Sequence, residues 1–117
     1  MSETEDHLPR VRRICLAMPD TWEKLSHGAP TFFVKKSVFA MYVQNHHSDG
    51  HIAVWLPVPP GEQPALIAED PATYYHPPYV GVKGWVGIEL SRVDDETLGA
   101  HLTEARRLIA NKTNKKR

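Results

Sequence analysis

Two segments constrain the fold of this chain most: KLSHGAPTFFV at 24–34 and YYHPPYVGVKGWVGIEL at 74–90. Each combines aromatic residues and a histidine with glycine or proline, the residues that bend a backbone sharply. We therefore expect two distant loops that meet in space and line a common hollow with polar and aromatic side chains. In particular, His27 and Tyr79 are predicted to lie close together.

The size and charge of the chain indicate one folded domain. Its 117 residues suffice for a single hydrophobic core and are too few for two comfortable domains, so we expect one domain over 1–117. Apolar residues make up 41% and charged residues 24%, which argues against wholesale disorder. The formal net charge is zero. A strong nonspecific polyanion binder would usually carry a positive excess, because it gains affinity by releasing counterions.

The cellular location is also suggested by the sequence. No stretch approaches the roughly 20 apolar residues that span a bilayer, and the acidic N-terminus lacks the features of a signal peptide. The lone Cys15 cannot form an internal disulfide. We expect a cytoplasmic protein with no membrane partner, and we interpret Cys15 as a packed core thiol because it lies on an apolar stripe.

Three helices are predicted. The first has an apolar stripe at spacings of three and four, with Pro9 in its first turn. A short helix is expected over 64–69, with a brief further turn of helix over 71–75. The closing helix should run over 95–110 from an Asp94 cap, with an inner stripe of Leu98, His101, Leu102, Ala105, Leu108 and Ile109. The stripe of the first helix comprises Leu8, Val11, Ile14, Cys15 and Met18.

Runs of β-branched and aromatic residues between turn formers predict an antiparallel sheet. A turn centred on Lys35 and Lys36 should join the second and third strands. The short connections require antiparallel order. The predicted fold class is α+β, with two layers: an antiparallel sheet covered on one face by the N-terminal, C-terminal and short middle helices. The strands are expected near 22–26, 31–35, 37–44 and 51–57, and along the alternating Val86, Ile88 and Leu90.

Histidines and acids cluster in one loop, but they do not predict a metal site. His46, His47, Asp49 and His51 are all possible ligands. Their spacing matches no closed zinc pattern and no cysteine accompanies them, so we interpret this segment as a solvated loop. No metal and no cofactor are expected.

Catalytic motifs are also missing from the sequence. Acid and base catalysis would need His27 held near Glu23, Tyr79 or Lys83, and nothing in the spacing fixes that geometry. There is no GxSxG, no phosphate-binding P-loop and no HExxH. The glycines near position 84 do not have the spacing of a dinucleotide fingerprint. We therefore expect a protein that is not an enzyme.

Basic residues suggest nucleic acid as one partner. Lys35 and Lys36 at a hairpin tip, with Arg10 and Arg13 on the first helix, are the candidate nucleic-acid-binding residues. Such side chains reach phosphates, while exposed aromatics stack on bases. Lysines at a hairpin tip also keep a turn soluble, so this hypothesis stays open at this point.

A second hypothesis is a binding cleft for a small ligand or peptide. It would be formed by His27, Tyr79, Lys83 and Trp85, which the two unusual segments supply. A third hypothesis is a protein-interaction adaptor that pairs through an exposed sheet or helix face. A monomer or weak dimer is expected.

A resemblance to a known family is carried by four strings: LAMPDTWEKLSHGAPTFFV, VFAMY, the DP before an aromatic pair, and PPYVGVKGWVGIEL. On these strings the sequence resembles the MmcQ/YjbR-like family of small bacterial proteins over nearly its whole length. The resemblance implies an α+β fold with an antiparallel sheet, likened both to secretion chaperones and to a double-wing DNA-binding arrangement. Members are commonly labelled DNA-binding because of that shape, so the resemblance favours a DNA-binding or regulatory module. At Lys36 the sequence departs from the glycine expected in many relatives.

Overall fold

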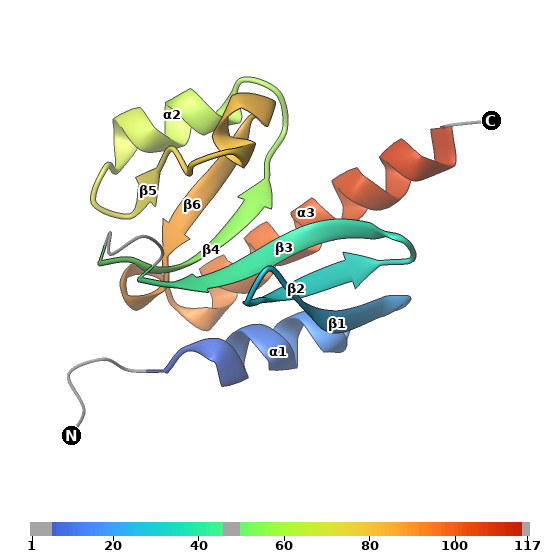
Figure 1. Ribbon diagram of the computed structural model, residues 1–117. Helices are drawn as coiled ribbons and strands as arrows, with labels where there is room; N and C mark the ends of the chain where they lie inside the picture. Colours follow the sequence, from blue (N-terminus) through green and yellow to red (C-terminus); the bar gives the residue numbers. More distant parts are fainter. Residues whose placement is uncertain (1–5, 46–49, 116–117) are drawn as a thin grey trace.

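The structure is a computed structural model that describes residues 6–45 and 50–115. Within these residues the first and last elements are helices, and six strands lie between them (Figure 1). The elements in order are α1 (Leu8–Leu16), β1 (Thr21–Ser26), β2 (Ala29–Val34), β3 (Ser37–Gln44), β4 (Ile52–Pro57), α2 (Glu62–Glu69), β5 (Tyr74–Tyr75), the 3₁₀ turn η2 (Val80–Lys83), β6 (Trp85–Glu89), the 3₁₀ turn η3 (Leu90–Arg92) and α3 (Asp95–Lys115).

The six strands form one sheet in the order β1-β2-β3-β4-β6-β5, and all neighbours are antiparallel. Figure 1 shows α1 and α3 on one side of this sheet. The short helix α2 contributes Leu66 and Ile67 to the same core. The predicted α+β class, with helices on one face, is therefore confirmed. No helix in the described ranges is long and apolar enough to cross a membrane.

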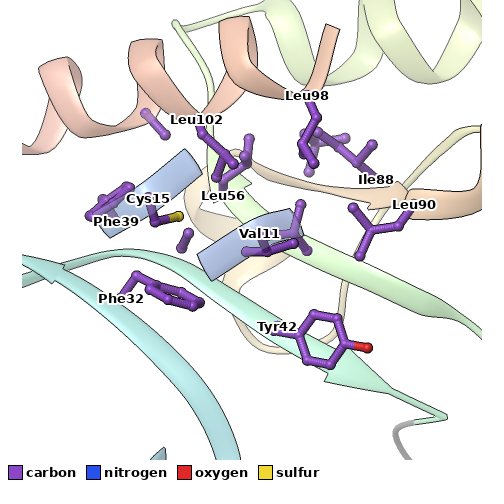
Figure 2. Close-up of a cluster of buried hydrophobic side chains, with 14 of the residues drawn as sticks. Val11, Cys15, Phe32, Phe39, Tyr42, Leu56, Ile88, Leu90, Leu98 and Leu102 are labelled. Atoms are coloured by element: carbon purple, nitrogen blue, oxygen red, sulfur yellow. The ribbon is translucent and has the colours of Figure 1, made fainter. Parts of the chain in front are cut away.

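The main core lies between the sheet and the helices. Period-two alternation sends Val86 and Ile88 of β6 into it, while α1 supplies Val11 and Cys15, all fully buried (Figure 2). Of the predicted stripe of α3, Leu98, Leu102 and Ala105 are buried in the main core and Ile109 packs against it. The Asp94 carboxylate accepts a hydrogen bond from the Thr97 amide at 2.9 Å. This core holds the sheet rigid and leaves its other face to the loops.

Two tight turns shape the β1-β2-β3 unit. His27 and Gly28 join β1 to β2 with φ of 53° and 82°, the positive values that favoured two-residue hairpins need. Lys35 and Lys36 join β2 to β3 as predicted. The left-handed residue there is Lys35, at φ 58°. Its carbonyl accepts a hydrogen bond from Trp22 Nε1 at 2.6 Å, which helps hold a turn that lacks glycine.

A bulge at Phe39 bends β3. The register pairs Phe32 with Ala40 but Phe33 with Val38, so Phe39 is the extra residue on β3. Pairing between β3 and β4 starts only at Met41 and its partner Trp55. The beginning of β3 therefore separates from β4, and this separation makes room for one of the hollows described below.

Several predicted boundaries need correction. Leu90, expected in the last strand, lies instead in the 3₁₀ turn η3. The expected helical turn over 71–75 is wrong at its end, because Tyr74 and Tyr75 form β5 and pair with Ile88 and Gly87 of β6. Both tyrosines favour strand geometry, and β6 offers them an open edge. The short helix begins earlier, at Glu62, and the closing helix continues to Lys115.

Candidate ligand site

The face of the sheet opposite the helices carries a second apolar cluster. Ala53 and Trp55 of β4 point there because their neighbours Val54 and Leu56 point into the main core. Partly buried side chains of the 74–85 segment pack against this cluster, so that segment lies over part of the open face. The cluster comprises Val43, Ala53 and Trp55, with Met41, Tyr75, Val80 and Trp85 packed on it.

One hollow on this face, the His27 hollow, has a volume of about 500 Å³. The imidazole of His27 comes from the β1–β2 turn and the phenol of Tyr79 from the 74–90 segment, so the two unusual segments do meet. The lining is completed by Ser26, Ala29, Met41, Val43 and Trp55.

Both of these residues have unusual backbone conformations. Tyr79 lies at φ 67° and ψ −68°, and the Val80 amide donates to the Pro78 carbonyl at 2.6 Å. These values describe the rare form of γ-turn, which is strained for a residue with a side chain. Tyr79 is nevertheless 68% exposed. The fold thus holds a large aromatic ring at the hollow against a backbone preference.

The second hollow, the Lys83 hollow, has a volume of about 680 Å³ and occupies the space where β3 separates from its neighbour. Strand β6 supplies Trp85 and η2 supplies Lys83, while Lys112 reaches it from α3. Its remaining lining residues are Ser37, Val38, Met41, Val80 and Ile109.

The four residues predicted to form one cleft are therefore divided between two hollows. His27 and Tyr79 line the first, and Lys83 and Trp85 line the second. Met41 lines both, so the hollows are neighbours on the sheet. The prediction of one common cleft is replaced by two adjoining ones.

A polar network beside these hollows was not anticipated. His51 Nδ1 lies 2.6 Å from Glu89 Oε1, and the imidazole stacks on the Tyr75 ring at 3.9 Å. The Tyr75 hydroxyl accepts a hydrogen bond from Trp55 Nε1 at 2.9 Å. His51 is thus packed and bonded, contrary to the solvated loop expected. The local sequence signal for this packing is the alternation of His51, Ala53 and Trp55, which places His51 on the same face of the strand as Trp55. His46, His47 and Asp49 lie outside the described residues.

The candidate nucleic-acid residues have different surroundings. Arg10 donates to the carbonyl oxygens of Leu90 at 2.9 Å and Val93 at 2.7 Å, and it pairs with Asp95. Arg13 also pairs with Asp95. Both guanidinium groups therefore join α1 to the start of α3.

Lys35 and Lys36, by contrast, are exposed at the hairpin tip. They are not brought together with Arg10 and Arg13 into a shared set of contacts in the described part of the chain. Within 6–45 and 50–115, no group of three or more His, Cys, Asp or Glu side chains could hold a metal ion.

Two titratable side chains on the helical side of the sheet are shielded from water: Cys15 is fully buried and His101 is partly buried. Burial raises the pKa of the Cys15 thiol far above its usual range, which keeps it protonated. His101 Nε2 lies 2.9 Å from the Tyr74 hydroxyl, and burial lowers the pKa of this histidine. Neither side chain lines either hollow.

Comparison with known proteins shows what this fold is similar to. No curated protein matches the chain. Among solved structures, the chain is similar to the crystal structure of Deinococcus radiodurans protein DR2400, which carries the family domain DUF419. The TM-score is 0.75 at 22% sequence identity, and the match covers 91% of this chain and 80% of that one, which shows a common fold. The sequence model of the YjbR family matches residues 16–108, a span that includes the whole sheet, and the chain therefore belongs to the YjbR family.

Proposed function

We propose that the protein is a non-enzymatic binding module that takes a small organic ligand in the His27 hollow. The observation that carries this proposal is the meeting of His27 and Tyr79 at one hollow, each on a positive-φ backbone. Strained backbone conformations cost free energy and persist only where the surrounding structure enforces them, and they cluster at binding sites.

The lining of the His27 hollow suggests the kind of ligand. Met41, Val43 and Trp55 form an apolar floor, while the imidazole and the phenol supply hydrogen-bonding groups. Small-molecule sites in proteins combine these two elements. The hollow therefore fits a planar ring that carries one or two hydrogen-bonding substituents.

A binding role is favoured over catalysis by the surroundings of His27. In the described part of the chain, the His27 ring forms no ion pair with a carboxylate, whereas a general base is usually oriented by such a partner. The histidine that has a carboxylate partner is His51, and it lines neither hollow. A reaction at the His27 hollow would lack that support.

The test is an NMR titration of the ¹⁵N-labelled protein with a library of small aromatic fragments. We expect shifts centred on the amides of Ser26, Ala29 and Val43. The variant Ser26→Trp should fill the hollow and abolish those shifts, and His27→Ala should weaken binding. Fragments that shift only amides elsewhere, or that bind Ser26→Trp as well as the parent protein, would contradict the proposal.

Nucleic-acid binding is the second candidate function, and the β2–β3 tip favours it. Lys35 and Lys36 are exposed there, beside Trp22, which is 41% exposed and stacks on Phe33 at 4.3 Å. Exposed aromatics next to cations can hold single-stranded bases. The double variant Lys35→Glu/Lys36→Glu should abolish mobility shifts of a labelled oligonucleotide at low salt. Absence of a shift with the unmodified protein at low salt would reject this candidate.

A further inference from the structure

Five arginines on the two terminal helices are ion-paired, whereas two lysines that line one hollow are not. The described arginines of α1 and the two on α3 all form ion pairs. Lys83 and Lys112 form no ion pair with any carboxylate in the part of the chain that the structure describes, and both are exposed. Although the net charge of the chain is zero, the positive charges of Lys83 and Lys112 are not paired with a described carboxylate. The pairs are Arg10 and Arg13 with Asp95, Arg12 with Glu23, Arg106 with Asp20, and Arg107 with Glu104.

The two lysines lie at the same hollow although they come from different layers. Lys83 belongs to η2 above the open face, and Lys112 belongs to the C-terminal part of α3. They share the Lys83 hollow with the apolar side chains of Val38, Trp85 and Ile109. No described carboxylate lines it. A hollow with apolar walls and two ammonium groups that form no ion pair with a described carboxylate is complementary to a molecule with an apolar part and an anionic group.

We propose that the Lys83 hollow binds an amphipathic anion, a free molecule with an apolar chain or ring and a carboxylate or phosphate head. The apolar part would displace water from Val38, Trp85 and Ile109. The head group would lie between Lys83 and Lys112. Ammonium groups on flexible stems act as point charges and accept either type of head group. A volume of about 680 Å³ is within the range of ordinary ligand sites.

This site is separate from the His27 hollow, although Met41 borders both. The separation arises from the Phe39 bulge, which moves Val38 away from β4 and opens the space between the β2–β3 hairpin and Trp85. Binding at one hollow can therefore be blocked without filling the other. Val38→Trp fills the Lys83 hollow, and Ser26→Trp fills the His27 hollow.

The experiment is isothermal titration calorimetry with decanoate, decyl phosphate and the neutral 1-decanol, each below its aggregation concentration. We expect decanoate and decyl phosphate to bind at least about tenfold more tightly than decanol, which corresponds to about 1.4 kcal/mol. Affinity for both anions should fall as salt is raised, because exposed charges are screened. Comparison of the two anions shows which head group the lysines prefer.

Variants locate the site. Lys83→Glu/Lys112→Glu should weaken decanoate binding by at least about tenfold, because the favourable charges become repulsive. The matched control Lys35→Glu/Lys36→Glu makes the same charge change at the hairpin tip and should leave decanoate affinity unchanged. Val38→Trp should abolish binding, whereas Ser26→Trp should not. Circular dichroism and urea unfolding establish that each variant is folded.

Several results would overturn the proposal. Equal affinity for decanoate and decanol would remove the role of charge, and unchanged binding in both Val38→Trp and the Lys83→Glu/Lys112→Glu variant would place the amphiphile elsewhere. Binding to anionic phosphatidylglycerol vesicles without binding to free decanoate would indicate a membrane surface as the target. Loss of decanoate binding in Ser26→Trp would show that the hollows act as one. The NMR test of fragment binding at the His27 hollow uses other ligands, so failure of decanoate binding would not contradict the proposed function.

Discussion

The ring of Tyr75 lies against the backbone of Gly87, its partner across the β5–β6 pair. A Cβ added at Gly87 would meet Tyr75 ring atoms at 2.5 Å. The same tyrosine accepts the Trp55 hydrogen bond and stacks on His51. At Gly87, therefore, the Tyr75 ring of the polar network packs directly against the backbone of β6.

We predict that Gly87→Ala lowers the free energy of unfolding by about 1–3 kcal/mol, the usual cost of overpacking. The new methyl group must displace Tyr75 and with it the contacts of Trp55. Urea unfolding monitored by tryptophan fluorescence measures the change. Gly99→Ala is the matched control, because a Cβ at Gly99 in α3 meets no atom within 4 Å. It should raise stability by about 0.5–1 kcal/mol, and equal losses in both variants would contradict this explanation.

Arg10 and Arg13 share Asp95 but should differ in importance. The Arg10 side chain is 17% exposed and holds two backbone carbonyls, whereas Arg13 is 61% exposed. Arg10→Ala leaves the Leu90 and Val93 carbonyls without this partner, so we expect a loss of at least about 1–3 kcal/mol. Arg13→Ala should cost less than about 1 kcal/mol. Equilibrium urea unfolding compares the two.

The Cys15 thiol should be unreactive toward thiol reagents in the folded protein. It is fully buried, and burial raises the pKa of its thiol, so the reactive thiolate is scarce at neutral pH. We expect a thiol reagent such as dithionitrobenzoate to react only as fast as the protein opens, and fully in urea. Prompt labelling without denaturant would show that the α1–sheet contact opens readily.

The partly buried His101 should make stability depend on pH. Burial lowers the pKa of His101 in the folded state below its ordinary value of 6.5. Below pH 6.5, His101 is therefore protonated in the unfolded chain while it is still neutral in the folded chain. Stability should therefore fall as pH decreases from 6.5 toward the lowered pKa. His101→Gln keeps a polar group near the Tyr74 hydroxyl but cannot titrate. Its unfolding free energy should fall less between pH 7.5 and 5.5 than that of the parent, and identical slopes would contradict the argument.

Local sequence patterns predicted most of this fold because they depend on nearby residues. Alternation marked β6, and the stripe from Leu98 to Ile109 marked the inner face of α3. The meeting of His27 and Tyr79 at one hollow followed from their shared context of bends and aromatics. What could not be predicted depends on long-range register. His51 meets Glu89 only because Ala53 pairs with Glu89 across β4 and β6.

The division of the ligand site has the same kind of cause. A single extra residue at Phe39 separates β3 from β4, and no local signal distinguishes a bulge from a regular strand in this apolar run. The contact of Lys112 with the second hollow depends on α3 continuing past the helix end that the apolar stripe predicted. The strands were thus easier to predict than the spaces between them.

Tyr79 offers a way to separate stability from binding. Its φ of 67° is strained for tyrosine and natural for glycine. Tyr79→Gly should relieve that strain, whereas Tyr79→Ala removes the same ring and keeps the Cβ that causes it. We expect the glycine variant to be more stable than the alanine variant by about 1–2 kcal/mol in urea unfolding. Both variants should lose fragment binding at the His27 hollow in the NMR titration, because both lack the phenol. If alanine proved as stable as glycine, the γ-turn would carry no strain, and the reason to regard Tyr79 as held in place for its ligand would disappear.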